Sequence, residues 1–180
     1  MFAQYEPNVK ATISFLKQLD VKVHNATIDE TLQNHPDWPS LLCISDSLNK
    51  WNIPNGAGKT DPEKIDELPT PFIAYTIDRE NPLFIVSKIN ETTVEGNHKN
   101  YNKTIVDKKE DFIKKWNGIY LIAEPNEHSG EYNYEVNNRK FLFNSLIPVT
   151  AFIVLVFLSL FFINRTANAV SVNANGIYFQ

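Results

Sequence analysis

The chain has 180 residues, a formal net charge of −4 and 43% hydrophobic residues. This length suits one ordinary domain with its own core and one additional segment. Acidic and basic residues are mixed along the chain without a basic stripe, so nucleic acid is not expected as a partner. The single cysteine, Cys43, excludes an intrachain disulfide, a redox-active cysteine pair and a thiolate zinc cluster within this chain.

The first part of the chain predicts three helices. A helix over 7–19 begins with Pro7, which suits the first helical position, and carries apolar residues at helical spacing. Thr27 and Glu30 match a capping box, which predicts a second short helix that ends before the turn HPDWPS. Ser40 then predicts the start of a third helix, LLCISDSLNKW, with an apolar face.

After a short helical turn over 61–68, the pattern changes from helical spacing to strands. PFIAYTI and LFIVSKI are rich in β-branched and aromatic residues, which is typical of strands. A turn at Asn90 returns the chain through TTVEG, Asp107 and Glu110 cap a predicted helix DKKEDFIKKW, and GIYLIAEP predicts a last buried strand. Helices followed by an antiparallel sheet define the α+β class.

A strongly apolar segment lies near the C-terminus. Residues 141–164 contain no charged side chain and include LIPVTAFIVLVFLSLFFI. A helix of about 20 apolar residues spans the ~30 Å hydrocarbon core of a bilayer. The segment therefore predicts a transmembrane helix. The alternative is a buried helix of a soluble protein, but core helices rarely lack charge on every face.

These patterns divide the chain into four parts. We expect a domain over 1–125, a polar linker over 126–140, the transmembrane helix over 141–164 and a tail over 165–180. The first residues lack a basic stretch followed by an apolar run, so the apolar segment is expected to act as its own insertion signal. Two basic residues precede this segment and one follows it, and that bias favours a cytoplasmic domain.

Several stretches in matching order and spacing carry a family resemblance. SLLCISDSLNKWNI matches a helix of the form S-L-x-x-I-S that is followed by G-I, and in the family a basic strand comes next. EKIDELPTPFIA then matches E-K-L-x-E-L-P-x-P-x-I-A, and EDFIKKWNG matches E-x-F-x-x-x-W-x-G. Together they resemble the papain-like leader-peptidase domain of bacteriocin-exporting ABC transporters, best over residues 38–125. The resemblance implies N-terminal helices packed on an antiparallel sheet.

A second likeness concerns what surrounds the domain. HPDWPSLL and ELPTPFIA resemble a bacterial arrangement in which such a domain precedes a vitamin K epoxide reductase-like membrane domain. In that arrangement the apolar segment is the first transmembrane helix, NGIYFQ begins the next membrane segment, and the redox cysteines lie beyond Gln180. The resemblance implies the bacterial inner membrane as location and disulfide-bond formation as the parent process.

The resemblance also implies where catalytic residues would stand. Active members use a cysteine at the start of the first helix, a histidine at the start of the central strand and an aspartate after the following strand, because the thiolate attacks while the imidazole moves the proton. The corresponding positions here are Asn8, Leu83 and either Gly96 or Asn97. An amide and an aliphatic side chain cannot replace a thiolate and a base, so we expect a pseudo-peptidase.

Cys43 is the weak alternative nucleophile. It lies in the third predicted helix, and a free cysteine in a helix is usually a small, buried apolar residue with an unreactive thiol. The alternative interpretation pairs it with His24, His35 or His98, although no spacing supports this. Neither these histidines nor His128 show zinc-site spacing, so no metal is expected. GAGKT lacks the first glycine of a phosphate-binding loop, so no cofactor is expected.

Three functional hypotheses follow. The leading one is a non-catalytic, membrane-tethered module whose degenerate cleft binds an extended peptide, or which regulates a membrane domain that is C-terminal to this chain. The alternative is an active cysteine peptidase that cleaves leader peptides for a bacteriocin-type ABC exporter. A third interpretation is a stand-alone anchored protein from a truncated gene.

Overall fold

The computed structural model describes residues 5–175, and the side chains of this range except those of 137, 140–145 and 164–175. It divides into two compact units, Met1–Tyr134 and Glu135–Gln180. The first unit extends beyond the expected domain end at residue 125. The reason is that the following residues still bind the domain: the Ser129 hydroxyl donates to the carbonyl of Asn52 at 2.7 Å.

Three helices form the N-terminal part of the first unit. They are α1 (Pro7–Gln18), α2 (Asn25–Gln33) and α3 (Leu41–Lys50). The predicted cap of α3 is confirmed, because the Ser40 hydroxyl accepts a hydrogen bond from the Cys43 backbone N–H at 3.2 Å.

The predicted capping box of α2 is wrong. The N-cap of this helix is His24, so Thr27 lies inside the first turn. The backbone N–H of His24 donates to the Glu131 carboxylate at 2.9 Å, and this contact comes from the far end of the domain. A long-range hydrogen bond at the helix start therefore overrides the local pattern.

The rest of the first unit is a six-stranded antiparallel sheet in the order β1-β6-β2-β3-β4-β5. A short 3₁₀ helix and one α-helix interrupt it. The elements in chain order are β1 (Asn55–Lys59), η1 (Pro62–Glu67), β2 (Phe72–Thr76), β3 (Leu83–Ile89), β4 (Thr93–Asn97), β5 (Thr104–Lys108), α4 (Lys109–Lys115) and β6 (Trp116–Ala123).

Two strands, β1 and β5, form the edges of the sheet, and β1 lies where the family resemblance implies a basic strand. β1 has the sequence NGAGK, which has low strand propensity, and it forms because each of its residues pairs with β6, from Asn55 opposite Ala123 to Lys59 opposite Ile119. β5 pairs with β4 in the same way. The GAGKT motif therefore contributes to an edge strand, not to a loop that leads into a helix.

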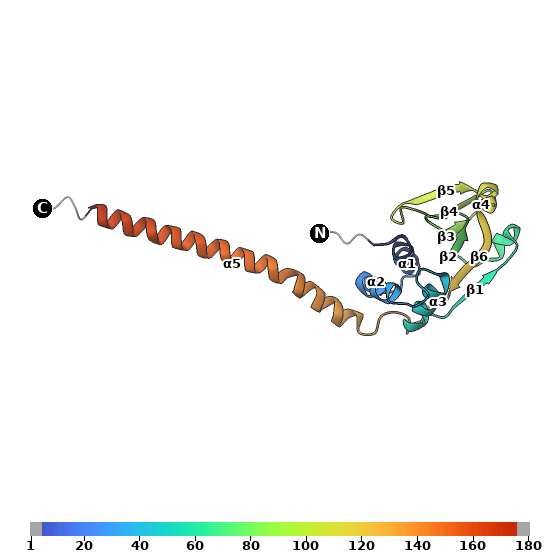
Figure 1. The fold of residues 1–180 in the computed structure, drawn as a ribbon, viewed down its shortest axis with the longest axis horizontal. Coiled ribbons are helices and arrows are strands. Elements are labelled where there is room, and N and C mark those ends of the chain that lie inside the picture. The colour runs from blue at the N-terminus through green and yellow to red at the C-terminus, as the bar shows by residue number, and fades with distance from the viewer. Residues whose placement is uncertain (1–4, 176–180) are drawn as a thin grey trace. The chain divides into compact units, whose positions relative to one another are not determined.

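Alternating side chains of the central strands pack into two separate hydrophobic cores, one on each face of the sheet. Ile73 and Leu83 face the N-terminal helices, whereas Phe72 and Phe84 pack with Phe112 of α4. Figure 1 shows α1, α2 and α3 gathered on one side of the sheet and α4 beside β4 and β5. The structure thus confirms the predicted α+β class, with the N-terminal helices packed on an antiparallel sheet.

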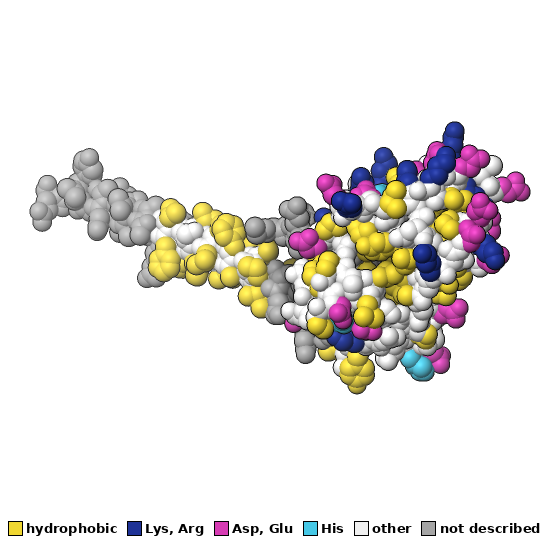
Figure 2. Space-filling view, turned by 45° about the vertical axis from the view of Figure 1, so that its right-hand side comes forward, with side chains coloured by type: hydrophobic (Ala, Val, Ile, Leu, Met, Phe, Trp, Pro, Cys, Tyr) yellow, Lys and Arg dark blue, Asp and Glu magenta, His cyan; other side chains and the backbone are white. Residues whose placement is uncertain are grey.

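The second unit contains nearly all of α5 (Tyr134–Asn175), a helix of 42 residues whose first residue still belongs to the first unit. It begins within the segment 126–140 that was expected to be a linker. Its stretch Leu146–Ile163 has a mean hydropathy of 2.8 and no buried residue, so it is long and apolar enough to cross a membrane. Figure 2 shows hydrophobic side chains over the visible face of this stretch.

Gly96 of β4 has no room for a side chain, which makes a stability test possible. A Cβ there would overlap the backbone carbonyl of Ile85 and the ring of Phe84, whereas a Cβ on Gly56 of β1 would meet nothing within 4 Å. We expect Gly96→Ala to lower the free energy of unfolding by about 2 kcal/mol or more, because β4 must move away from β3 to make room for the added methyl group.

Gly56→Ala is the matched control and should leave the free energy of unfolding within about 0.5 kcal/mol of the parent. Urea denaturation of the full chain in a non-ionic detergent, followed by tryptophan fluorescence, measures both. Equal stability of the two variants would contradict the close approach of β4 to β3.

Candidate functional site

Asn8 occupies the second position of α1, where the resemblance places the nucleophile. Its side chain is 9% exposed, and its amide Nδ2 donates to the Pro39 carbonyl at 2.7 Å. Its own carbonyl accepts the Thr12 hydroxyl at 2.9 Å. The amide therefore ties the start of α1 to the segment before α3.

Leu83, at the position of the histidine, begins β3 and is 1% exposed. It belongs to the apolar core that α1 and α3 share with the sheet. Its carbonyl accepts the Tyr101 hydroxyl at 2.8 Å, and burial raises the pKa of that phenol, with the negative charge of Asp78 adding to the rise. This position supplies packing and no titratable group.

Asn97, at the position of the aspartate, ends β4 opposite Ile85. It is 7% exposed, and its Oδ1 accepts a hydrogen bond from the Gln18 amide at 2.7 Å. Gln18 ends α1, so it lies ten residues, or about 15 Å of helix, from Asn8. Gly96, the other candidate for this position, carries no side chain.

The three positions have separate partners. In the part of the chain that the structure describes, no hydrogen bond or ion pair joins Asn8, Leu83 or Asn97 to one another. None of the three side chains can form a thiolate or accept a proton near neutral pH. At these three positions the side chains supply hydrogen bonds and packing.

The thiol of Cys43 is fully buried in α3, with 0% exposure. It donates to the Leu32 carbonyl at 3.4 Å, and the Ser47 hydroxyl donates to the Cys43 carbonyl at 2.7 Å. Burial raises the pKa of this thiol above its usual value, although Ser47 and the charge of Lys50 oppose the rise. The thiol therefore stays protonated and out of contact with solvent.

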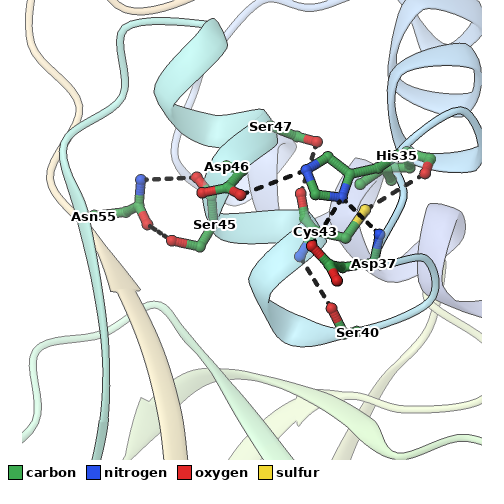
Figure 3. Close-up of polar contacts among 9 residues, drawn as sticks. His35, Asp37, Ser40, Cys43, Ser45, Asp46, Ser47 and Asn55 are labelled. Carbon is green, nitrogen blue, oxygen red and sulfur yellow. Dashed lines mark hydrogen bonds and ion pairs between the residues drawn. The ribbon is translucent and has the colours of Figure 1, made fainter.

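His35 lies close to the start of α3, as Figure 3 shows, but it interacts with carboxylates. Its Nε2 is 3.4 Å from Asp46, and its Nδ1 accepts the backbone N–H of Asp37 at 3.2 Å. Because Nδ1 is an acceptor, the neutral ring carries its proton on Nε2, toward Asp46. No hydrogen bond joins this ring to the Cys43 thiol within the described residues, so the structure does not assemble a cysteine–histidine pair here.

The other histidines are also apart from the thiol. His24 contacts Glu131 through Nδ1 at 2.9 Å, and His98 contacts the Asn81 carbonyl through Nε2 at 2.7 Å. His128 is 81% exposed beside Glu127. Among the described residues there is no group of three or more His, Cys, Asp or Glu side chains that would hold a metal ion.

A hollow beside Asn97 was not predicted from the sequence. It has a volume of about 540 Å³, and Gln18, Ser87, Tyr101 and Thr104 contribute to its lining. These residues come from α1, β3 and the two sides of the β4–β5 connection. No sequence pattern joins them, because only the pairing of β3, β4 and β5 brings them together.

An α+β domain of this topology, with a first helix packed across the sheet, defines a class of cysteine-peptidase folds. The model of the Peptidase C39 family matches residues 3–128, and the chain belongs to this family. No curated protein matches the chain.

Solved structures agree with this assignment. The N-terminal peptidase C39-like domain of a toxin secretion ATP-binding protein from Vibrio parahaemolyticus aligns over 69% of this chain and 100% of its own, with 16% identity and a TM-score of 0.56. The peptidase domain of Streptococcus ComA, a bifunctional ABC transporter, aligns over 70% of this chain and 96% of its own, with 18% identity and a TM-score of 0.58.

A third structure was solved with a peptide. The double-glycine-motif protease of an AMS/PCAT transporter, in complex with its leader peptide, aligns over 70% of this chain and 89% of its own, with 14% identity and a TM-score of 0.59. At such identities the likeness concerns the fold. It confirms the papain-like peptidase fold and the predicted resemblance to the peptidase domains of exporters.

The buried Cys43 thiol leads to a prediction about its reactivity. We expect iodoacetamide to leave Cys43 unmodified in the folded full chain at pH 8 and to alkylate it fully in 6 M guanidinium chloride, because the thiol is both protonated and shielded. Intact-mass spectrometry measures the added group.

A control reagent tests accessibility separately. A cysteine introduced by His128→Cys, at a side chain that is 81% exposed, should react within minutes in the folded chain, while Cys43 stays unmodified. Alkylation of native Cys43 at a rate similar to that of the introduced thiol would contradict its burial.

Proposed function

We propose that this chain is a membrane-tethered member of the Peptidase C39 family that binds a peptide without cleaving it. One observation carries the proposal: the position that begins α1 holds Asn8, whose amide is hydrogen-bonded to Pro39 at 2.7 Å, and the position that begins β3 holds Leu83, which is 1% exposed. Thiolate attack requires a sulfur at the first position and a base at the second.

The state of the remaining thiol supports the proposal. An active peptidase built on this chain needs Cys43 as nucleophile, because it is the only cysteine in the sequence. That thiol is fully buried, has a raised pKa and donates to a backbone carbonyl. Exposing it would require α3 to leave the core, which also holds Ile44 and Leu48 at 0% exposure.

Binding of a peptide does not need the lost groups. An extended peptide binds a cleft through backbone hydrogen bonds and through pockets that accept its side chains. The hollow beside Asn97 offers amide groups from Gln18 and Asn97 and a hydroxyl from Ser87. We place the peptide there, because backbone N–H and C=O groups pair well with amide and hydroxyl side chains.

The apolar stretch of α5 would supply the tether. In the proposed arrangement it crosses the bacterial inner membrane, and the peptidase-like domain is cytoplasmic, as the basic residues before residue 141 favour. The resemblance to vitamin K epoxide reductase-like proteins would make the domain a module that presents or regulates a membrane partner engaged in disulfide-bond formation.

Peptide binding without cleavage is tested with a fluorescein-labelled double-glycine leader peptide and the full chain in a non-ionic detergent. We expect a saturable rise in fluorescence anisotropy, and mass spectrometry should find the peptide intact after overnight incubation. Ser87→Trp, which fills the hollow beside Asn97, should weaken binding roughly tenfold or more, because a bulky ring excludes the peptide. Thr92→Trp, in the exposed β3–β4 turn, is the control and should bind like the parent.

Cleavage would decide against the proposal. If the parent hydrolysed the peptide and Cys43→Ala abolished hydrolysis, the chain would be an active cysteine peptidase. If the parent showed no anisotropy change with any double-glycine peptide, the peptide-binding part of the proposal would fail.

Membrane anchoring is tested by placing charges in the apolar stretch. In the double variant Leu155→Lys, Leu158→Lys each lysine at the helix centre costs on the order of 2.5 kcal/mol of insertion free energy. We expect the parent to remain in the pellet after carbonate extraction and the double variant to move largely to the supernatant. Ile77→Lys, on a residue that is 65% exposed in the domain, is the control and should stay in the pellet. Extraction of the parent itself would contradict the tether.

A further inference from the structure

A second hollow lies between α1, the start of α2 and the β4–β5 connection. Its volume is about 490 Å³, which is within the range of small-molecule sites. The helix α1 forms one wall through side chains one and two turns apart. The residues used below are Lys10, Lys17, Asn25, Lys99, Asn100 and Asn102.

The charge of this hollow is positive, although the chain carries a net charge of −4. Lys10, Lys17 and Lys99 line it, and none of the described residues in its lining is an aspartate or a glutamate. Lys10 and Lys17 are seven residues apart on α1, about 10 Å along the helix, so they face the same side. Cations gathered around one hollow repel one another, and an anion between them would relieve that repulsion.

The three lysines differ in how far their charge is already neutralised. Lys99 lies 3.1 Å from the Asp78 carboxylate, and its hydrogen bond lowers the pKa of that carboxyl. Lys10 and Lys17 make no side-chain hydrogen bond or ion pair with any residue that the structure describes. The two lysines of α1 are therefore the cations that remain available to a ligand.

Neutral donors complete the lining. Asn25, Asn100 and Asn102 bring amide N–H₂ groups, and Asn25 is also the first residue of α2. The residue before it, His24, makes no side-chain cap, and the first turn of α2 contains no acidic residue. Lysine ammonium groups and amide donors around one hollow suit a ligand with many acceptor oxygens and more than one negative charge, as phosphate groups have.

We propose that this hollow binds a small ligand that carries two or more phosphate groups, held by Lys10 and Lys17 with a weaker contribution from Lys99. Such phosphates come either from a soluble phosphorylated compound or from lipid headgroups. This hollow adjoins the hollow beside Asn97, and Ser14, Lys17, Tyr101 and Asn102 line both. The site goes beyond the proposed peptide binding, since a phosphate probe tests it without any peptide.

The test uses sodium pyrophosphate as probe and isothermal titration calorimetry of the full chain in a non-ionic detergent at low ionic strength. We expect saturable one-to-one binding that weakens as sodium chloride is added, because the contacts are charge-assisted. Lys10→Gln and Lys17→Gln should each weaken binding roughly tenfold, and Lys99→Gln only two- to threefold, since Asp78 already neutralises Lys99.

Lys64→Gln is the matched control. Lys64 lies on η1, whose buried Ile65 packs in the core on the other side of the sheet, so the variant removes the same charge far from the hollow. Its affinity for pyrophosphate should equal that of the parent. Absence of binding, or equal weakening by Lys64→Gln and Lys10→Gln, would overturn the proposal. Tight binding of a polyglutamate peptide with no binding of pyrophosphate would overturn it as well.

The source of the phosphate is distinguished by repeating the titration in nanodiscs. Discs of phosphatidylcholine alone are compared with discs that also contain phosphatidylglycerol. If lipid headgroups occupy the hollow, the anionic discs weaken the apparent affinity for pyrophosphate in the parent. If the affinity is the same in both discs, the ligand is soluble. Either result supports the site, provided that Lys10→Gln and Lys17→Gln lower the affinity in neutral discs.

Discussion

The burial of alternate residues on β2 and β3 holds α1 against one face of the sheet and α4 against the other. Ile73 and Phe72 are neighbours in the sequence, yet both are 0% exposed because they enter different cores. Fully burying one such side chain stabilises the fold by about 1.5–3 kcal/mol. Neither helix can shift without exposing a core, so the start of α1 keeps its position relative to β3 whether or not it carries a nucleophile.

This constraint would allow the peptidase fold to persist without a nucleophile and a base, as our proposal requires. Leu83 stands where the resemblance places a histidine, and there it adds to the core instead of titrating. Asn8 stands where it places a cysteine, and its amide links α1 to Pro39. Both residues contribute contacts that a partly charged site would weaken, because buried charge is costly without a partner. If the chain is non-catalytic, as we propose, these two positions serve the packing of the fold.

The sequence predicts those parts of the fold that depend on local contacts. Ser40 caps α3 through a bond to its own helix, and the β-branched and aromatic residues of β2 and β3 indicate strands without knowledge of a partner strand. The start of α2 was not predictable, because it is fixed by Glu131, and β1 was indicated only by the family resemblance, because NGAGK has low strand propensity of its own. The candidate catalytic positions came from the family resemblance and remain predictions. The two hollows were missed because they join residues that are far apart in the chain.

Because the single cysteine is buried, thiol-reactive probes can be attached to introduced cysteines without replacing Cys43. A spin label or fluorophore attached to an introduced surface cysteine would report from one site only, since Cys43 of α3 is fully buried and its thiol contacts the Leu32 carbonyl. A pair of such probes, one in the domain and one on α5, would give the distance between the two units as they sit in a bilayer. The same burial that removes Cys43 from chemistry therefore leaves the native residue in place while the motion of the domain is followed.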